Sequence, residues 1–140
     1  NGNRTAGATG IRFISDHVVR HCNLRSLFLS DCGITTNGTE ALTYLCKEIR
    51  GNRTIRILEL RKNHINDEGA EIISNLILKR DNNVVENLFL NGNDITAKGA
   101  AKLITGLRPD SKCCIWLQGN KIDQNAQEVF KEMAGSCVKF

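Results

Sequence analysis

The stretch LFLNGNDITAKG, residues 88–99, sets leucine, asparagine, isoleucine and glycine at intervals that recur along the chain. Three segments share one fifteen-position pattern: LRSLFLSDCGITTNG from Leu24, IRILELRKNHINDEG from Ile55 and VENLFLNGNDITAKG from Val85. Positions one, four and six are apolar, position nine is Cys or Asn, position eleven is Ile and position fifteen is Gly. A fourth segment, KCCIWLQGNKIDQNA from Lys112, keeps positions four, six, nine and eleven. Repetition at this period predicts a stacked architecture.

Each copy has the pattern of a strand followed by a helix. The apolar residues at positions four and six alternate with other residues, which is typical of a strand with one buried face. The residue after the isoleucine belongs to the set that caps helix starts; in order, these residues are Thr35, Asn66, Thr96 and Asp123. Apolar residues then recur at helical spacing, as in Leu42, Leu45 and Ile49, in Ile73 and Leu76, in Leu103 and Leu107, and in Phe130, Met133 and Cys137.

A strand–helix unit of this size cannot bury a core alone, so successive units are expected to stack with their strands in parallel. The first 23 residues supply only helical spacing, through Ile11, Ile14 and Val18. We therefore predict one α/β domain over residues 1–140, with a helical half-repeat at 1–23 and full repeats at about 24–54, 55–84, 85–111 and 112–140. The missing strand and the lack of a polar cap suggest a fragment of a longer protein that could self-associate through this end.

The pattern LxxLxLxx(N/C)xIxxxG with a following helix resembles the leucine-rich repeat family. The long repeat and the Cys/Asn choice resemble its ribonuclease-inhibitor-like subfamily, and also the repeats of NOD-like receptors and Ran GTPase-activating proteins. This resemblance implies a right-handed solenoid with strands on the concave face and helices on the convex face. It also implies a protein–protein interaction module that binds a protein partner on its concave face. The alternatives are a GTPase-activating regulator of a small GTPase, or the ligand-sensing part of an immune receptor or pathogen effector.

The repeated asparagines and glycines are predicted to be scaffold. A side chain that both donates and accepts can satisfy turn backbone groups that no sheet ladder reaches, and the residues in this role are Cys32, Asn63, Asn93 and Asn120. A small residue in the first helical turn allows close helix packing, and this position holds Gly7, Gly38, Gly69, Gly99 and Ala126.

Catalytic and metal-binding chemistry find little support. His17 and His21 stand four residues apart, but a structural zinc site needs four committed ligands. No nucleophile and base come together in the predicted register. We therefore predict a protein that is not an enzyme and has no metal site and no cofactor.

Charge and composition limit the classes of partner and the cellular locations that the sequence supports. The net charge is +4, with acidic residues interspersed among the basic ones, which argues against nucleic-acid binding. No apolar run reaches the roughly 18 residues of a membrane span. Six cysteines without a compact spacing indicate reduced thiols and a cytoplasmic location. Asn-X-Thr patterns at Asn3, Asn37 and Asn52 keep a secreted or cell-surface location as the alternative.

The candidate binding residues occupy positions that the repeat leaves free. Position five points out of the sheet, and its residues form a column across neighbouring parallel strands: Phe28, Glu59, Phe89 and Trp116. Flanking positions add Ile57, Arg61, Asp31, Lys62 and Gln118. Aromatics beside charges have the composition of a binding hot spot, with the alternative that the aromatics simply pack on one another.

Overall fold

The computed structural model describes residues 7–35, 38–79 and 84–140, where five parallel strands form one sheet in sequence order. The strands are β1 (Ser26–Phe28), β2 (Ile57–Glu59), β3 (Asn87–Phe89), β4 (Cys114–Trp116) and β5 (Val138–Lys139). The α-helices are α1 (Gly7–Ile14), α2 (Glu40–Gly51), α3 (Asp67–Ile73), α4 (Ala97–Gly106) and α5 (Gln124–Ala134). Single π-helical turns, Ser15–Val19 and Ser74–Leu78, extend α1 and α3, and a 3-10 turn, Gly135–Cys137, follows α5.

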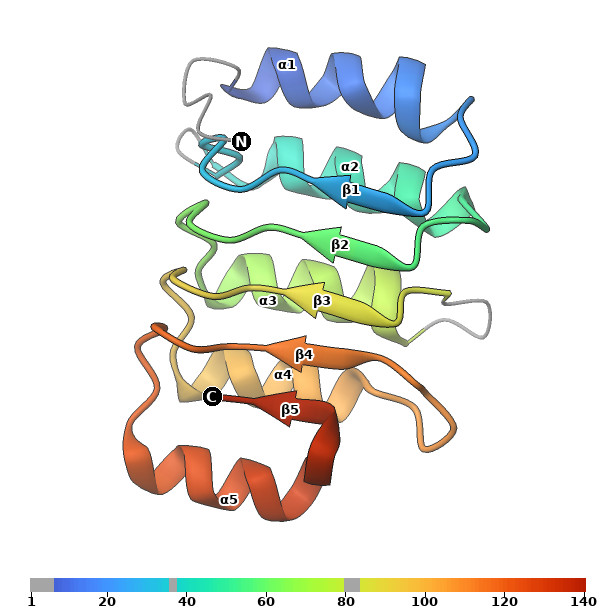
Figure 1. Ribbon diagram of the computed structural model, residues 1–140. Helices are drawn as coiled ribbons and strands as arrows, with labels where there is room; N and C mark the ends of the chain where they lie inside the picture. Colours follow the sequence, from blue (N-terminus) through green and yellow to red (C-terminus); the bar gives the residue numbers. More distant parts are fainter. Residues whose placement is uncertain (1–6, 36–37, 80–83) are drawn as a thin grey trace.

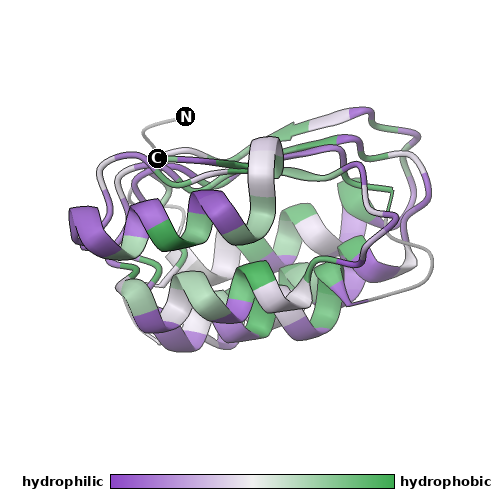
Figure 2. Ribbon diagram, turned by 90° about the horizontal axis from the view of Figure 1, so that it is seen from below, coloured by the Kyte–Doolittle hydropathy of each residue, from purple (hydrophilic) through white to green (hydrophobic). Residues whose placement is uncertain are grey.

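The strands and helices form two layers (Figure 1). The helices α2, α3 and α4 lie behind the sheet, while α1 lies beyond β1 and α5 below β5. Viewed from below, the strands run along one side of the molecule and the helices along the other (Figure 2). The predicted α/β stack of parallel strands on one face and helices on the other is confirmed.

The core lies between the two layers and is built from the alternating strand positions. The central residues of β1 to β4 pair in register across the sheet and are at most 7% exposed: Leu27, Leu58, Leu88 and Ile115. The apolar residues two positions later are also buried: Leu29, Leu60, Leu90 and Leu117. One face of every strand is therefore committed to the core, and the other face is left open.

Buried asparagine side chains join successive turns. Asn63 Oδ1 accepts from the N–H groups of Cys32 (2.9 Å) and Ile34 (3.3 Å), one repeat earlier. Its Nδ2 donates to the carbonyls of Leu29 (2.7 Å) and Arg61 (3.1 Å). Equivalent bonds are made by Asn93 and Asn120. Each amide thus closes its own turn and ties it to the preceding repeat.

The helix starts follow the predicted caps in three repeats of four. Side-chain oxygens of Asn66, Thr96 and Asp123 accept from backbone N–H groups of α3, α4 and α5. The prediction for Thr35 is wrong, because α2 begins only at Glu40, after Thr39. The Thr35 hydroxyl instead donates to the Asn63 carbonyl at 2.6 Å, so this side chain serves the turn rather than the helix.

The glycine position also has more than one role. A Cβ on Gly69 would lie 2.7 Å from the Ile65 side chain, and one on Gly99 would lie 2.4 Å from Asp67 Oδ1. These two glycines allow close packing, as predicted. The same prediction is wrong for Gly7 and Gly38, because a Cβ there would meet nothing within 4 Å. Both adopt positive φ, +46° and +107°, so the backbone conformation explains glycine there.

Asp67 links two neighbouring helices. Its carboxylate accepts from the N–H groups of Thr96 (2.8 Å) and Gly99 (3.0 Å) and from the Thr96 hydroxyl (2.7 Å). An anion at this point complements the positive end of the α4 dipole. The first turn of α3 therefore caps the first turn of α4, a contact that the sequence pattern did not predict.

The last repeat differs most from its prediction. Phe130 is buried as expected, but Met133 is 61% exposed, so its assignment to a buried helix face is wrong. Cys137 lies in the 3-10 turn rather than in α5, and it is partly exposed. The sequence pattern missed β5, in which Val138 pairs with Ile115 and is buried.

Candidate functional site

The face of the sheet turned away from the helices, here called the open face, corresponds to the predicted concave surface. Strand pairing sets Phe28, Glu59, Phe89 and Trp116 side by side in one column, as the repeat alignment predicted. The register extends the column to Lys139 on β5. Lys139 was missed because a two-residue strand leaves no periodicity to detect.

Phe89 and Trp116 form a stacked pair at the centre of the open face. Their ring centroids are 5.3 Å apart with an interplanar angle of 19°. Both residues are half-buried, so part of each ring still faces solvent. Phe89 and Trp116 therefore do pack on one another, which was the alternative interpretation of the aromatic column. The pair nevertheless remains partly accessible to solvent. Phe28 is 50% exposed and is separated from the pair by Glu59.

Arg61 lies over the aromatic pair. Its guanidinium carbon is 4.6 Å from the centroid of the Phe89 ring, within the range of a cation–π contact. Arg61 Nε donates to Asn91 Oδ1 at 3.3 Å. The Asn91 amide donates in turn to Gln118 Oε1. A row of cation and amides thus runs beside the aromatic pair and holds the Arg61 side chain in place.

The Glu59 carboxylate is paired with neighbouring side chains and is mostly shielded from solvent. Its carboxylate accepts from the Ser30 hydroxyl and lies 3.8 Å from an Arg61 nitrogen. Only 12% of the Glu59 side chain is exposed. Along the column, the exposed ring of Phe28 is therefore followed by the hydrogen-bonded carboxylate of Glu59 and then by the stacked pair of Phe89 and Trp116. Ile57, which precedes Glu59 by two positions, is also partly exposed on this face.

The turns at the ends of the strands use left-handed backbone at position eight of the repeat. Asp31 and Lys62 have φ of 52° and 54°, and Gly92 and Gly119 have φ of 65° and 73°. Glycine adopts this conformation without the steric cost that other residues meet. Lys62 nevertheless adopts this left-handed conformation, and its side chain is exposed beside Gly92. A Cβ added to Gly92 would lie 3.3 Å from Lys62 Cγ.

The indole of Trp116 carries a hydrogen-bond donor without an acceptor. Trp116 Nε1 is buried, and it has no hydrogen-bond partner among the residues that the structure describes. A buried N–H without a partner costs free energy.

Asp94 is the centre of a charged cluster formed by the loops that follow β2, β3 and β4. Lys121 Nζ lies 2.7 Å from Asp94 Oδ1, and His64 Nδ1 lies 3.2 Å from Oδ2. The bond from Lys121, followed by that from His64, holds the pKa of Asp94 below its ordinary value despite partial desolvation. His64 is exposed.

Replacing Lys121 with Gln should raise the pKa of Asp94, because Lys121 is the largest cause of its depression. A carboxyl group whose pKa is lower in the folded protein than in the unfolded protein stabilises the fold at pH values above the unfolded pKa. This contribution is lost as the pH falls through the folded pKa. A carboxyl NMR titration should therefore show a higher Asp94 midpoint in Lys121→Gln than in the wild type. Lys98→Gln, a change of the same charge on α4, should leave the midpoint unchanged. Equal midpoints in all three proteins would contradict the assignment.

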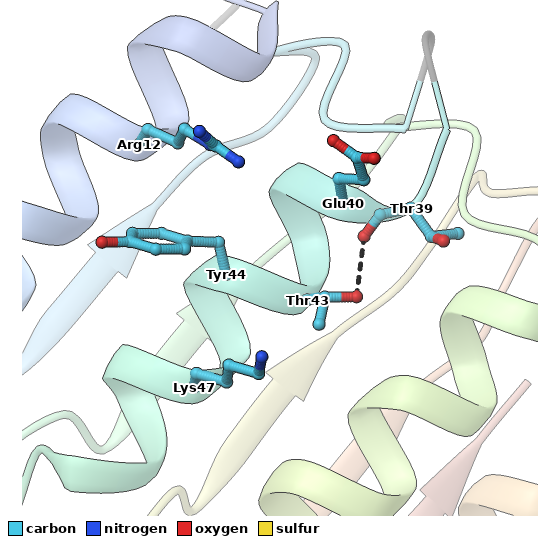
Figure 3. A pocket seen from close by; sticks show the side chains of 6 residues that line it. All are labelled: Arg12, Thr39, Glu40, Thr43, Tyr44 and Lys47. Atoms are coloured by element: carbon cyan, nitrogen blue, oxygen red, sulfur yellow. Dashed lines mark hydrogen bonds between the residues drawn. The ribbon is translucent and has the colours of Figure 1, made fainter.

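A second surface feature lies between α1 and α2 (Figure 3). A depression of about 330 Å³ is lined by Arg12, Thr39, Glu40, Thr43, Tyr44 and Lys47. Arg12 lies over the Tyr44 ring at 5.5 Å, and the Tyr44 hydroxyl donates to Asp16 at 2.6 Å. Thr43 donates to the Thr39 carbonyl. The hydroxyls and the Arg12 cation mainly bind neighbouring helix groups, so this depression ranks below the open face as a candidate.

His17 lies in the π-helical turn that extends α1, and the exposed His21 lies in the turn after it. His17 stacks on Phe13 with ring centroids 4.3 Å apart, and its Nδ1 lies 3.0 Å from the Phe13 carbonyl. Across residues 7–35, 38–79 and 84–140, no three His, Cys, Asp or Glu side chains gather as a metal ion would require. The helices of these same segments include none that is both long and apolar enough to cross a membrane.

All six cysteines are free thiols, but their environments differ. Burial raises the pKa of Cys46 to about 12. Burial, with smaller contributions from Cys114 and Cys137, also raises the pKa of Cys113 to about 12. Cys22 is exposed. Since the thiolate is the reactive form, these thiols should differ in reactivity.

Iodoacetamide at pH 8 should therefore modify Cys22 in the native protein and leave Cys46 and Cys113 largely unmodified. In denaturant, all three thiols should react. Mass spectrometry of the digested protein measures modification at each position. Rapid native-state modification of Cys46 would contradict the burial that the structure gives it.

One of the three Asn-X-Thr patterns can be described structurally. Asn52 Nδ2 donates to the Val19 carbonyl at 2.8 Å, and its Oδ1 accepts from Thr54 and Ile55. This side chain closes the connection after α2, so a glycan at Asn52 would have to share the nitrogen that makes the bond. The patterns at Asn3 and Asn37 lie outside the described residues.

Comparison with known proteins gives matches in both sequence and fold. Residues 20–42, 51–74 and 81–103 match the family described as Leucine Rich repeat. A Mus musculus ribonuclease inhibitor is 34% identical over 58 residues, which make up 41% of this chain and 12% of that protein. Thus the matched stretch spans only a small part of this relative.

Two solved structures share the fold. Leiomodin-1 Actin-Binding Site 2 superposes with a TM-score of 0.70 at 16% identity, covering 89% of this chain and 70% of that one. The tropomodulin C-terminal domain from Caenorhabditis elegans gives a TM-score of 0.67 at 13% identity, covering 95% and 81%. At these identities the likeness establishes the architecture.

Proposed function

This chain belongs to the leucine-rich repeat family, and from that premise we propose that it is a protein-binding module whose open sheet face receives the partner. Phe89 and Trp116 are the apolar anchors, and Phe28 is a further contact at the edge of the face. Arg61, Lys62, Asp31 and Gln118 orient the partner around them. The observation that carries the proposal is the stacked, partly exposed aromatic pair under Arg61.

The physical support is that these residues are not needed by the fold. The core of β3 and β4 is already filled by Leu88, Leu90, Ile115 and Leu117, all at most 1% exposed. Phe89 and Trp116 project from the opposite face, where they stack on each other and remain partly exposed. Aromatic and arginine side chains dominate binding free energies when they become fully desolvated at an interface. A partner covering this pair would complete that desolvation.

The test compares capture of partners by matched variants. The double variant Phe89→Ala, Trp116→Ala should reduce recovery of the proteins that the wild type captures from a cell extract by tenfold or more, since hot-spot truncations typically cost about 2 kcal/mol or more each. The control variant Val129→Ala, Met133→Ala removes exposed apolar side chains of α5, which are 52% and 61% exposed. It should retain the wild-type recovery.

Circular dichroism and urea unfolding should show that both variants remain folded. Equal recovery by the wild type and the open-face variant would overturn the proposal. Loss of recovery only in the α5 variant would place the binding surface on the helical side instead.

Actin is a specific partner to test, because one of the solved structures sharing this fold is named for an actin-binding site. If the open face of this chain binds actin, the wild type should sediment with actin filaments or retard monomeric actin in gel filtration. The Phe89→Ala, Trp116→Ala variant should do neither. Actin binding that persists in this variant would separate actin from the open face.

A further inference from the structure

We propose that the open face selects an acidic segment of its partner. An apolar side chain of that segment sits on Phe89 and Trp116, and a neighbouring carboxylate pairs with Arg61. This inference rests on the proposed function, and it adds the chemical class of the bound segment.

At repeat positions three, five, seven and eight, the described residues over β3, β4 and β5 present no carboxylate, and the carboxylates next to these positions, Glu86 and Asp94, are paired with Arg56 and with Lys121 and His64. The residues at these positions are Asn87, Phe89, Asn91, Gly92, Cys114, Trp116, Gln118, Gly119 and Lys139. They offer aromatic rings, amides, a thiol and one ammonium group. An incoming carboxylate therefore meets no like charge at these repeat positions.

One cation contacts the aromatic pair, and two more belong to adjoining strand and turn positions. Arg61 lies over the Phe89 ring at 4.6 Å. The exposed Lys62 extends along the turn of β3, with its Cγ 3.3 Å from the place of a Cβ on Gly92. Lys139 is the register partner of Trp116 on β5. Positive charge thus approaches the apolar anchors from both neighbouring strands.

The acids of the open face lie on the other half and are already engaged. Glu59 accepts from Ser30 and also lies near Arg61. Asp31 lies in the turn after β1, three strands away from Trp116 on β4. The face is therefore polarised: Asp31 and Glu59 lie toward β1 and β2, whereas Arg61, which reaches over Phe89 from the turn after β2, and Lys139 on β5 flank the aromatic pair.

Arg61 has the geometry to hold a carboxylate. Its Nε donates to Asn91, and the nitrogen nearest Glu59 is 3.8 Å from that carboxylate, beyond a good hydrogen bond. The remaining guanidinium N–H groups can form the paired bonds that arginine makes with carboxylates. The Asn91 contact and the ring beneath fix the side chain before the ligand arrives, which lowers the entropic cost of pairing.

The orphaned indole N–H adds an independent reason to expect acceptor groups in the ligand. Trp116 Nε1 has no acceptor among the residues that the structure describes. A segment rich in carboxylates and carbonyls can supply one once the indole turns toward it.

Single-stranded nucleic acid shares stacking and negative charge with an acidic segment. It is less favoured because nucleic-acid grooves carry cations along the whole path of the backbone. The open face instead has Asp31 and Glu59 toward β1 and β2 and one cation, Arg61, in contact with the aromatic pair. Binding of an oligonucleotide to the aromatic pair would therefore overturn the inference.

The test selects ligands from a phage-displayed library of random peptides against the folded wild-type chain. Selected peptides should be rich in Asp and Glu and should contain an aromatic or large aliphatic residue. Their affinity should fall by about tenfold or more in Arg61→Gln, as expected for an interface hot spot. Lys98→Gln makes the same change of charge on α4 and should keep the affinity within about twofold, as for a remote exposed charge.

The remaining outcomes separate the two proposals. Peptides that require Phe89 and Trp116 but are neutral or basic, or that bind Arg61→Gln normally, overturn the acidic-segment inference and leave the proposed function standing. Peptides that bind Phe89→Ala, Trp116→Ala normally, or the absence of any enriched peptide, contradict the proposed function itself. Oligothymidine that displaces the selected peptides from the wild type overturns the inference in favour of nucleic acid.

Discussion

Replacing Asn93 with Ala should lower the free energy of unfolding by about 3–5 kcal/mol, because the change leaves several buried backbone groups without hydrogen-bond partners at once. Asn93 is 5% exposed and makes four hydrogen bonds. Its Oδ1 accepts from the N–H groups of Asn63 and Ile65, and its Nδ2 donates to the carbonyls of Leu60 and Leu90. No water can reach these groups without opening the turn, so the bonds cannot simply be replaced.

Urea unfolding of a graded series measures this effect. Asn120→Ala should cost less than Asn93→Ala, since Asn120 is only half-buried and makes three such bonds. Asn75→Ala is the matched control, because exposed Asn75 only accepts from Lys79 at 2.9 Å. The control should remain within about 0.5 kcal/mol of the wild type. An unfolding midpoint for Asn93→Ala as high as that for Asn75→Ala would contradict the role of the asparagine.

Replacing Gly99 with Ala should lower the free energy of unfolding by about 2–4 kcal/mol, the sum of overpacking and a weakened helix cap. The new Cβ would lie 2.4 Å from Asp67 Oδ1, 2.9 Å from the Ile95 side chain and 3.0 Å from Asp67 Cα. Because one of these atoms belongs to the backbone, α3 and α4 must separate. The separation also stretches the Asp67 bonds to Thr96 and Gly99.

Gly51→Ala provides the matched control for this prediction. Gly51 is the last residue of α2, and a Cβ there would meet nothing within 4 Å. Alanine should leave stability unchanged or raise it by up to about 1 kcal/mol, because glycine has more conformational entropy to lose on folding. Thermal unfolding of both variants separates the steric effect from the change in helix propensity. A Gly99→Ala protein as stable as Gly51→Ala would show that α3 and α4 can move apart freely.

Periodicity predicted the strand core and the column on the open face. Leu58 and Leu88 follow the alternation of a strand with one buried face, and both are fully buried. Parallel pairing in register then follows from the repeat itself, so the neighbours Glu59, Phe89 and Trp116 could be placed in one column without a structure. The repeated pattern carried this information because each copy repeats the same local geometry.

Contacts between repeats were not predictable in the same way. Gly106 interrupts an apolar helix position, and only the structure explains it: a Cβ there would lie 2.1 Å from Ser74 Oγ on the neighbouring helix. Asp67 reaches the start of α4 across a sequence separation of about thirty residues. Such contacts depend on the distance between two helices, which alternation and capping rules do not specify.

The open face was predicted in outline but not in its electrostatics. Sequence alone placed Glu59 and Arg61 near Phe89, but not the Arg61 guanidinium over the ring or the Glu59 bond to Ser30. Rotamers decide these contacts, and the pattern of a repeat does not determine rotamers. The half-buried state of Trp116 likewise follows from its stacking on Phe89.

Site-specific photo-cross-linking tests most directly whether the open face is the binding surface. Benzoylphenylalanine replaces Phe28 on β1 in one protein and Phe13 on α1 in another, two phenylalanines that are 50% and 61% exposed. Irradiation in the cell extract used for capture should yield adducts between the captured partner and position 28, with none at position 13. Adducts at position 13 alone, or captured partner without any adduct at position 28, would contradict binding through the open face.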